Sequence, residues 1–479
     1  MESKFPVVLL EFNELSPVLM ERFIRDGKLP NFQRLRDQSE VFHSEAEERA
    51  PNLEPWIQWV NVHTGVPYAD HGIFQLSEGH KVRHQCIWET VSNAGGTIWI
   101  CGSMNVRYDQ GIRGCILPDP WSTDVAPYPD TLSPYFRFIQ QNVLEHTNER
   151  VPLTTSDYVD FLRFMVRHGL SIPTVTSIVK QLSSEKLSHG GRWRRAFIMD
   201  KLQFDVFSAI YRRLKPTFST FFLNSTAHMQ HMYWRNMEPE LFTVAPKPEE
   251  QREFATAVLL GYREMDELVG RMMRLVGDQS TLILATGLSQ QACLLFESAG
   301  GKRAYRPRDF EVLLNFAGIT SAHRVAPVMA EQFYIHMENA SDAAVAETKL
   351  SRLRVAERQA IETRRDGSSI FTSCAINVAL EPDAILQNSE SGKSIPFSAM
   401  FYRIEEVKSG MHHPDGILWV RHPTRAHRIH PDKVSLTSIA PTILDLLGLK
   451  APASMKGLSL LAKDRGLHAQ PDYASPVAS

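Results

Sequence analysis

Two histidines three residues apart, His228 and His231, are the residues whose types and spacing most directly suggest chemistry in this sequence. On a helical turn this spacing puts both imidazoles on one face, about 5–6 Å apart. Neutral imidazole is the commonest metal ligand and a common general base, so the pair favours a metal or acid–base site. A histidine that begins a helix or packs in a core shows the same spacing, and that interpretation stays open.

Polar side chains also close the first apolar run of the chain, Pro6–Phe12. Glu11 lies at the end of this run, and Asn13 and Glu14 follow it. A carboxylate at such a point can act as a general base if it reaches a substrate or a water molecule. The segment after the first run is therefore a second place where catalytic residues are expected.

The elements that must position these residues follow from the apolar runs. Four short runs predict buried strands of a parallel sheet, and they span Pro6–Phe12, Ile98–Cys101, Phe218–Leu223 and Thr281–Ala285. Three stretches have helical spacing: Leu15–Asp26, Arg194–Leu214 and Glu249–Val276. Strands that alternate with helices predict an α/β fold, with a mostly parallel central sheet sandwiched by helices.

In open sheets of this kind the site lies beyond the carboxyl ends of the strands. The segments to search are Glu11–Ser16, Ser103–Arg107, Asn224–Trp234 and Thr286–Gln291. Two stretches interrupt the alternation, and we expect cap insertions over about 106–215, mostly helical between 134 and 190, and about 293–400. The remainder of 1–465 is expected to be one domain, and 466–479 a flexible tail.

Composition narrows the class of protein. The 479 residues include 52 Lys and Arg against 54 Asp and Glu, a net charge of −2, which does not suggest a nucleic-acid partner. Five cysteines lack Cys-x-x-Cys spacing, so we expect neither a disulfide framework nor a thiolate zinc site. The first apolar run is too short for a signal peptide or a membrane span. The sequence is therefore typical of a soluble cytoplasmic protein.

Four segments, in order along the chain, resemble motifs of the alkaline phosphatase superfamily, in its type I phosphodiesterase/nucleotide pyrophosphatase branch. They are Gly27–Phe32 with Leu35, Thr64-Gly65 followed by His71-Gly72-Ile73, Gly410–Ile417, and Ile439–Leu449 with Gly457 and Leu460. The resemblance implies an alkaline-phosphatase-like fold. It also implies a site in which two divalent metals flank a Thr or Ser nucleophile, which is chemistry that two close ions support.

The site positions depart from that pattern. Matched position by position, the residues that stand in place of family ligands or the nucleophile are Asn13, Pro55, Ala227, Thr286 and Gly287, whereas His231 and His412 are retained. The resemblance therefore implies at most one metal and no protein nucleophile. With His228 beside them, His231 and His412 give a three-histidine set that would hold one Zn²⁺ or Mn²⁺; the alternative is that no metal binds.

On this basis we expect a divergent hydrolase of a phospho- or sulfo-ester, with a small-molecule or carbohydrate ester, such as a nucleotide sugar, as substrate. The expected catalytic residues are Glu11 or Glu54 as general base, with Asn13. The expected substrate-binding residues are Asn224, Lys408, His413 and Trp56, because they would offer polar groups, charge and an aromatic face.

Two other functions stay open. The chain could be an inactive member of the superfamily that binds a ligand or a partner. It could also hydrolyse or transfer glycosyl groups without a metal, if Glu11 and Glu54 face each other about 5–10 Å apart. The residues that follow the strands are polar, although apolar residues would cost less free energy to bury there. This favours a functional site that binds a polar ligand. The sequence leaves the oligomeric state open.

Overall fold

The computed structural model describes residues 5–76, 78–144, 153–188, 191–327, 331–404 and 408–461. Its centre is an eight-stranded sheet in the order β20-β2-β19-β6-β1-β5-β3-β4. The strands are β1 (Val7–Phe12), β2 (Glu40–Glu45), β3 (Ile98–Cys101), β4 (Gly114–Leu117), β5 (Phe218–Leu223), β6 (Thr281–Ala285), β19 (Asp415–Arg421) and β20 (Arg428–Ser435). Only β19 runs against its neighbours, β2 and β6, so the predicted α/β fold with a mostly parallel sheet is confirmed.

The four predicted strands, β1, β3, β5 and β6, lie next to one another in this sheet. Each is a run of buried residues, because helices cover both faces of the sheet at this point. Along β1 the side chains alternate: Val8 and Leu10 belong to one hydrophobic core, and Val7 and Leu9 to the other. The two cores are therefore separated by the sheet itself.

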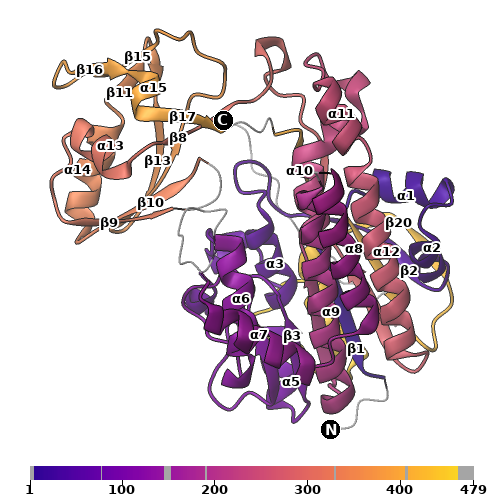
Figure 1. Ribbon diagram of the computed structural model, residues 1–479. Coiled ribbons are helices and arrows are strands. Elements are labelled where there is room, and N and C mark those ends of the chain that lie inside the picture. The colour runs from indigo at the N-terminus through magenta and orange to yellow at the C-terminus, as the bar shows by residue number, and fades with distance from the viewer. Residues whose placement is uncertain are drawn as a thin grey trace.

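Helices complete the two outer layers (Figure 1). One core includes residues of α1 (Pro17–Arg25), α2 (Pro30–Asp37), α9 (Arg195–Leu214) and α12 (Ala257–Val276). The other includes residues of α3 (Pro55–Thr64), α5 (Ile87–Asn93) and α16 (Ile439–Leu446). The stretch predicted as one helix over 249–276 is two helices, α11 (Pro248–Phe254) and α12, separated by a turn.

The first expected insertion is narrower than 106–215. β4 is the edge strand of the central sheet, and α9 packs on that sheet, although both fall inside the range. Three additional helices lie between them: α6 (Ser133–Leu144), α7 (Thr155–Arg167) and α8 (Ile172–Ser188). Within the described ranges, no helix combines the length and the apolarity that a bilayer crossing requires. The tail expected over 466–479 falls outside the described residues.

The second expected insertion corresponds to a lobe that projects from the body (Figure 1). Its strands are β8 (Ala304–Pro307), β9 (His323–Pro327), β10 (Phe333–Met337), β11 (Leu353–Val355), β12 (Arg358–Gln359), β13 (Ile361–Asp366), β14 (Ser369–Cys374), β15 (Ile385–Asn388), β16 (Ser394–Pro396) and β17 (Phe401–Ile404). Its helices are α13 (Phe310–Ala317), α14 (Ala340–Leu350) and α15 (Phe397–Met400). The lobe has a hydrophobic core of its own.

The chain enters and leaves this lobe through two short strands, β7 (Ser289–Ala292) and β18 (Gly410–His413). They pair antiparallel, with Gln290 opposite His412. The helix α10 (Ser225–Met237), which follows β5, packs against both strands. The carboxyl ends of β1, β5 and β6 therefore open onto α10 and this two-stranded ladder.

Candidate metal centre

Glu14 is the carboxylate at the centre of this region. It comes two residues after the end of β1, and its φ of 62° lies in the left-handed region, which costs a non-glycine residue about 1–3 kcal/mol. The backbone is held there by contacts with two other segments. Its N–H donates to the Thr286 carbonyl (3.1 Å), and its own carbonyl accepts a hydrogen bond from Gln230 Nε2 (2.8 Å). Such a conformation, imposed by the surrounding structure, is typical of functional sites.

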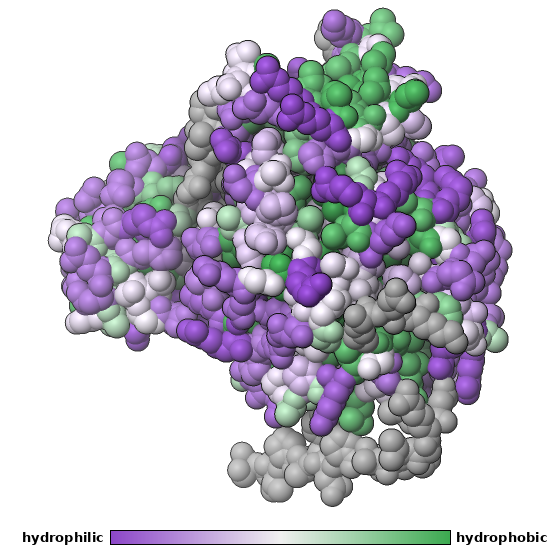
Figure 2. Space-filling model, turned by 90° about the horizontal axis from the view of Figure 1, so that it is seen from below, coloured by the Kyte–Doolittle hydropathy of each residue, from purple (hydrophilic) through white to green (hydrophobic). Residues whose placement is uncertain are grey.

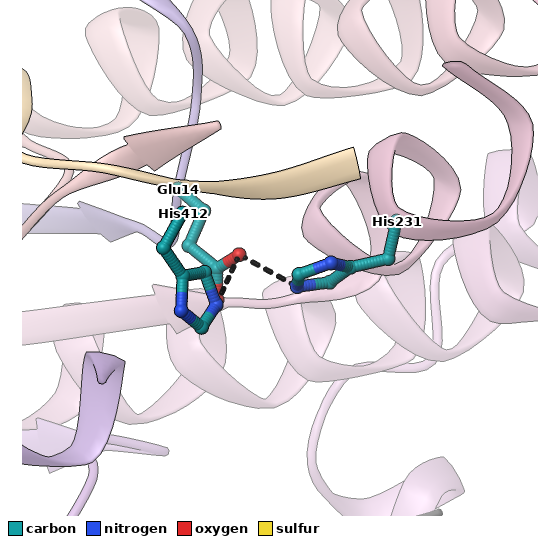
Figure 3. Close-up of side chains that lie close together, drawn as sticks. All are labelled: Glu14, His231 and His412. Carbon is teal, nitrogen blue, oxygen red and sulfur yellow. Dashed lines mark ion pairs between the residues drawn. The ribbon is translucent and has the colours of Figure 1, made fainter. Parts of the chain in front are cut away.

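Two imidazoles converge on this carboxylate, one from α10 and one from β18 (Figure 3). Oε2 of Glu14 lies 3.0 Å from Nε2 of His231 and 3.4 Å from Nε2 of His412. One ligand atom from each residue falls within 4.8 Å of the other two. The side chain of Glu14 is 3% exposed, whereas those of His231 and His412 are 20% and 14% exposed. The cluster is thus buried on the carboxylate side and reachable from the histidine side.

The other nitrogen of each imidazole is paired with a backbone carbonyl. His231 Nδ1 lies 3.2 Å from the Gly410 oxygen, and His412 Nδ1 lies 2.8 Å from the Leu53 oxygen. A carbonyl only accepts, so both Nδ1 atoms must carry the hydrogen. Each Nε2 therefore faces Glu14, either as an N–H donor when the imidazole is protonated or as a lone pair toward a bound ion, and an Nδ1–H held by a carbonyl is the arrangement found around metal-bound histidines.

The charges of the cluster are coupled. Burial acts to raise the pKa of Glu14, but His412 and His231 hold that pKa well below its ordinary value. Burial acts to lower the pKa of His412, yet Glu14 and Glu54 raise it. Burial and then Lys408 lower the pKa of His231 against the influence of Glu14. The buried carboxylate is therefore stabilised as an anion beside a cation, whether a proton on an imidazole or a metal ion.

Neutral amides fix the Glu14 side chain. Asn13 Nδ2 donates to Glu14 Oε1 (2.7 Å) and to Asn224 Oδ1 (2.7 Å), while the Trp59 indole donates to Asn13 Oδ1 (2.8 Å). Gln290 Nε2 donates to Glu14 Oε2 and to the Ala227 carbonyl (3.0 Å). Asn13 and Asn224, expected among the site residues, are brought to the cluster, and they orient its carboxylate.

Two further expected residues border the cluster. Glu54 Oε2 lies 3.5 Å from Nδ1 of His412, and burial raises the pKa of Glu54 despite the nearby His412 and Lys408. Lys408 is exposed, and its charge acts on Glu54 and both cluster histidines. Glu54 directly precedes α3, whose first residue is Pro55, so the first turn of this helix carries no hydroxyl at its start.

The side chain of Glu11 does not lie where the sequence predicts. Its side chain is fully buried, and Oε1 pairs with His63 Nε2 at 2.8 Å. The reason is the alternation of β1, which turns Glu11 toward the α3 face, whereas Glu14, beyond the strand, turns toward the histidines. Glu54 pairs with His412 instead. The structure therefore corrects the expectation that Glu11 and Glu54 both face the cleft, and it gives no support to the glycosyl mechanism.

His228 differs as well. It is exposed on α10 and lies outside the cluster, in which Glu14 is the third member. Three residues along a helix correspond to about 300°, so two such side chains point about 60° apart and need not share a ligand. The three-histidine set is therefore replaced by two histidines and a carboxylate.

The two remaining expected residues have structural partners. Trp56, in the first turn of α3, packs into the hydrophobic core on that side of the sheet, and its indole donates to the Phe74 carbonyl (2.7 Å). It is not an open stacking face, which removes the aromatic support for a carbohydrate ligand. His413, next to His412 on β18, accepts a hydrogen bond from the Asp415 backbone N–H at Nδ1 (3.2 Å).

The segments that meet here are the ones expected from the sequence, but Glu14 as a member of the cluster and Gln290 as its hydrogen-bond partner were not expected. Both lie within segments expected to follow strands, so position was a usable signal. The left-handed turn at Glu14, which aims its side chain, has no counterpart in the residue pattern. A comparison with models of protein families finds no match, and a comparison with curated proteins finds no significant similarity.

Proposed function

We propose that Glu14, His231 and His412 bind one divalent ion, Zn²⁺ or Mn²⁺, and that the protein hydrolyses a phospho- or sulfo-ester with water as the nucleophile. The observation that carries this proposal is the meeting of two Nε2 atoms on one buried carboxylate oxygen, at 3.0 and 3.4 Å. Two histidines and a glutamate form the ligand set of several catalytic zinc sites.

The donor set fits such an ion. Zinc bonds of 2.0–2.2 Å in a tetrahedron separate the ligand atoms by about 3.4 Å, close to both carboxylate–imidazole distances. Each Nδ1 already donates to a carbonyl, so each Nε2 offers its lone pair without a change of tautomer. Nitrogen and oxygen ligands together favour Zn²⁺ or Mn²⁺ over Mg²⁺ or Ca²⁺, which prefer oxygen ligands alone.

An ion held by three protein ligands supplies Lewis acidity toward an ester oxygen and lowers the pKa of water. The chain's own groups then have separate tasks. Glu54, beside His412 and partly exposed, is the carboxylate that accepts a proton from the attacking water. Lys408 supplies positive charge for the anionic ester. Asn13 and Gln290 keep Glu14 in place, since both donate to its carboxylate.

Metal content tests the proposal. Protein purified without chelator should contain about one Zn or Mn per chain, and His412→Ala and His231→Ala should lose it. His228→Ala is the matched control, because it removes an imidazole from the same helix as His231 but from its exposed side. Retention of the full metal content by His412→Ala would refute the proposed site.

Activity on ester panels then separates catalysis from ligand binding. The proposal expects turnover of aryl phosphate or sulfate esters that chelation abolishes and added Zn²⁺ or Mn²⁺ restores. If the metal is bound and no ester is hydrolysed, yet a ligand raises the melting temperature, the binding-module alternative replaces the hydrolase.

A further inference from the structure

A second polar site lies at the opposite edge of the sheet from the metal centre. The helices α9 and α12 lead into β5 and β6, so their last turns lie where these strands begin, whereas Glu14 follows the end of β1. A cavity of about 320 Å³ lies between these last turns and the start of α8. Its lining residues are Gly169, Ser171, Phe204, Asp205, Ser208, Arg212, Arg271, Arg274 and Leu275. Figure 1 shows the three helices side by side, and Figure 2 shows hydrophilic residues interspersed with hydrophobic patches on the underside.

Three arginines and one carboxylate give the cavity a net positive charge. The carboxylate is Asp205, whose Oδ1 accepts from Arg271 (2.9 Å) and whose Oδ2 accepts from the Ser171 backbone N–H (2.9 Å). The Arg271 guanidinium also stacks over the Phe204 ring, 4.3 Å from its centroid. Asp205 and Arg271 therefore satisfy each other and form a rigid wall.

The other two arginines of the cavity, Arg212 and Arg274, do not pair with Asp205. Arg212 and Arg274 are exposed, and neither has an ion-pair partner among the residues that the structure describes. Both lie in the last turns of their helices, where a cation interacts favourably with the helix dipole. That interaction accounts for their positions along the helices, but not for the cavity that both line.

We propose that this cavity binds the phosphate group of an organic phosphate. Arg212 and Arg274 would pair with its oxygens, while Asp205 keeps its partners Arg271 and the Ser171 backbone N–H. A volume of about 320 Å³ is at the lower end of small-molecule sites and exceeds what inorganic phosphate alone requires. The ligand is therefore a phosphate attached to a further group. This site stands apart from the metal centre and does not rest on the proposed hydrolase activity.

Binding of three probes to the full chain, treated with EDTA so that the metal centre does not compete, tests the proposal. Inorganic phosphate and adenosine monophosphate are titrated by calorimetry, and phosphatidylcholine vesicles containing phosphatidic acid are tested by sedimentation. The wild type should bind adenosine monophosphate or the vesicles more tightly than inorganic phosphate, and Arg212→Ala with Arg274→Ala should weaken that binding by roughly tenfold or more per arginine.

Arg213→Ala is the matched control, because Arg213 is exposed beside Arg212 on α9 but does not line the cavity. Binding that Arg213→Ala retains and the double variant loses supports the site. Binding of the soluble probes identifies a free metabolite as the source of the phosphate, and binding of vesicles alone identifies a lipid. No binding of any probe, or an equal loss in Arg213→Ala, overturns the proposal.

Discussion

Replacement of Asp200 by asparagine should stabilise the protein far more at pH 8 than at pH 5. Asp200 lies on α9 with 8% of its surface exposed, and its Oδ2 accepts a hydrogen bond from the Ser225 hydroxyl at the start of α10. Burial raises the pKa of this carboxyl to about 7, from an ordinary value of 3.8. The folded protein therefore disfavours the ionised form.

The sign and size follow from this shift. An acid whose pKa is raised by folding carries no penalty below its unfolded pKa and loses stability as the pH rises through its folded pKa. For values of 3.8 and about 7, the penalty is about 2 kcal/mol at pH 5 and about 4 kcal/mol at pH 8. Asparagine cannot ionise, and the cost of placing an amide group there, about 1–3 kcal/mol if its donor finds no acceptor, does not depend on pH.

Subtracting the stability change measured at pH 5 from that measured at pH 8 therefore cancels this pH-independent cost. The free energy of unfolding of Asp200→Asn, relative to wild type, should be about 2–3 kcal/mol higher at pH 8 than at pH 5. Urea unfolding in EDTA measures both values, and Asp278→Asn, at a carboxyl that is 91% exposed, is the control. An equal effect of Asp200→Asn at both pH values would refute the reasoning.

Three further predictions concern the metal centre. Gln290→Ala removes a donor to Glu14 and should lower metal affinity roughly 10–100-fold in chelator competition, whereas Gln291→Ala, at the exposed neighbouring residue, should not. Glu54→Gln should retain the metal but lower kcat roughly 10²–10⁴-fold on an ester that the wild type hydrolyses; an unchanged kcat would show that Glu54 is not the base. Zn²⁺ at about 100 times its dissociation constant should stabilise the wild type by about 3 kcal/mol in thermal unfolding, and it should leave His412→Ala unaffected.

The fold was predictable where burial leaves a continuous apolar run. The central strands β1, β3, β5 and β6 are buried on both faces, so most of their residues are apolar. The edge strand β20 was not predicted, because most of its residues are exposed and polar. Tertiary pairing, rather than its own residue pattern, makes β20 a strand, since it extends a sheet that is already formed.

The site was predictable in its segments and only partly in its side chains. His231 and His412 were named, and they meet as expected. His228 was expected as the third member of the cluster because spacing alone does not resolve a 60° rotation on a helix. Glu14 takes that place through a left-handed backbone held by Thr286 and Gln230, which lie far away in the sequence. Contacts of that kind are set by the fold and leave no local pattern.

X-ray absorption at the zinc edge of the zinc-loaded protein would identify the ligands of the ion directly. We expect one zinc per chain with two imidazole nitrogens, from His231 and His412, and oxygen ligands that include Glu14, at about 2.0–2.2 Å. Substitution of His412 by alanine should remove one imidazole or the metal itself, and His228→Ala should leave the spectrum unchanged. A shell of three imidazoles, or a chain that binds no zinc, would contradict this expectation.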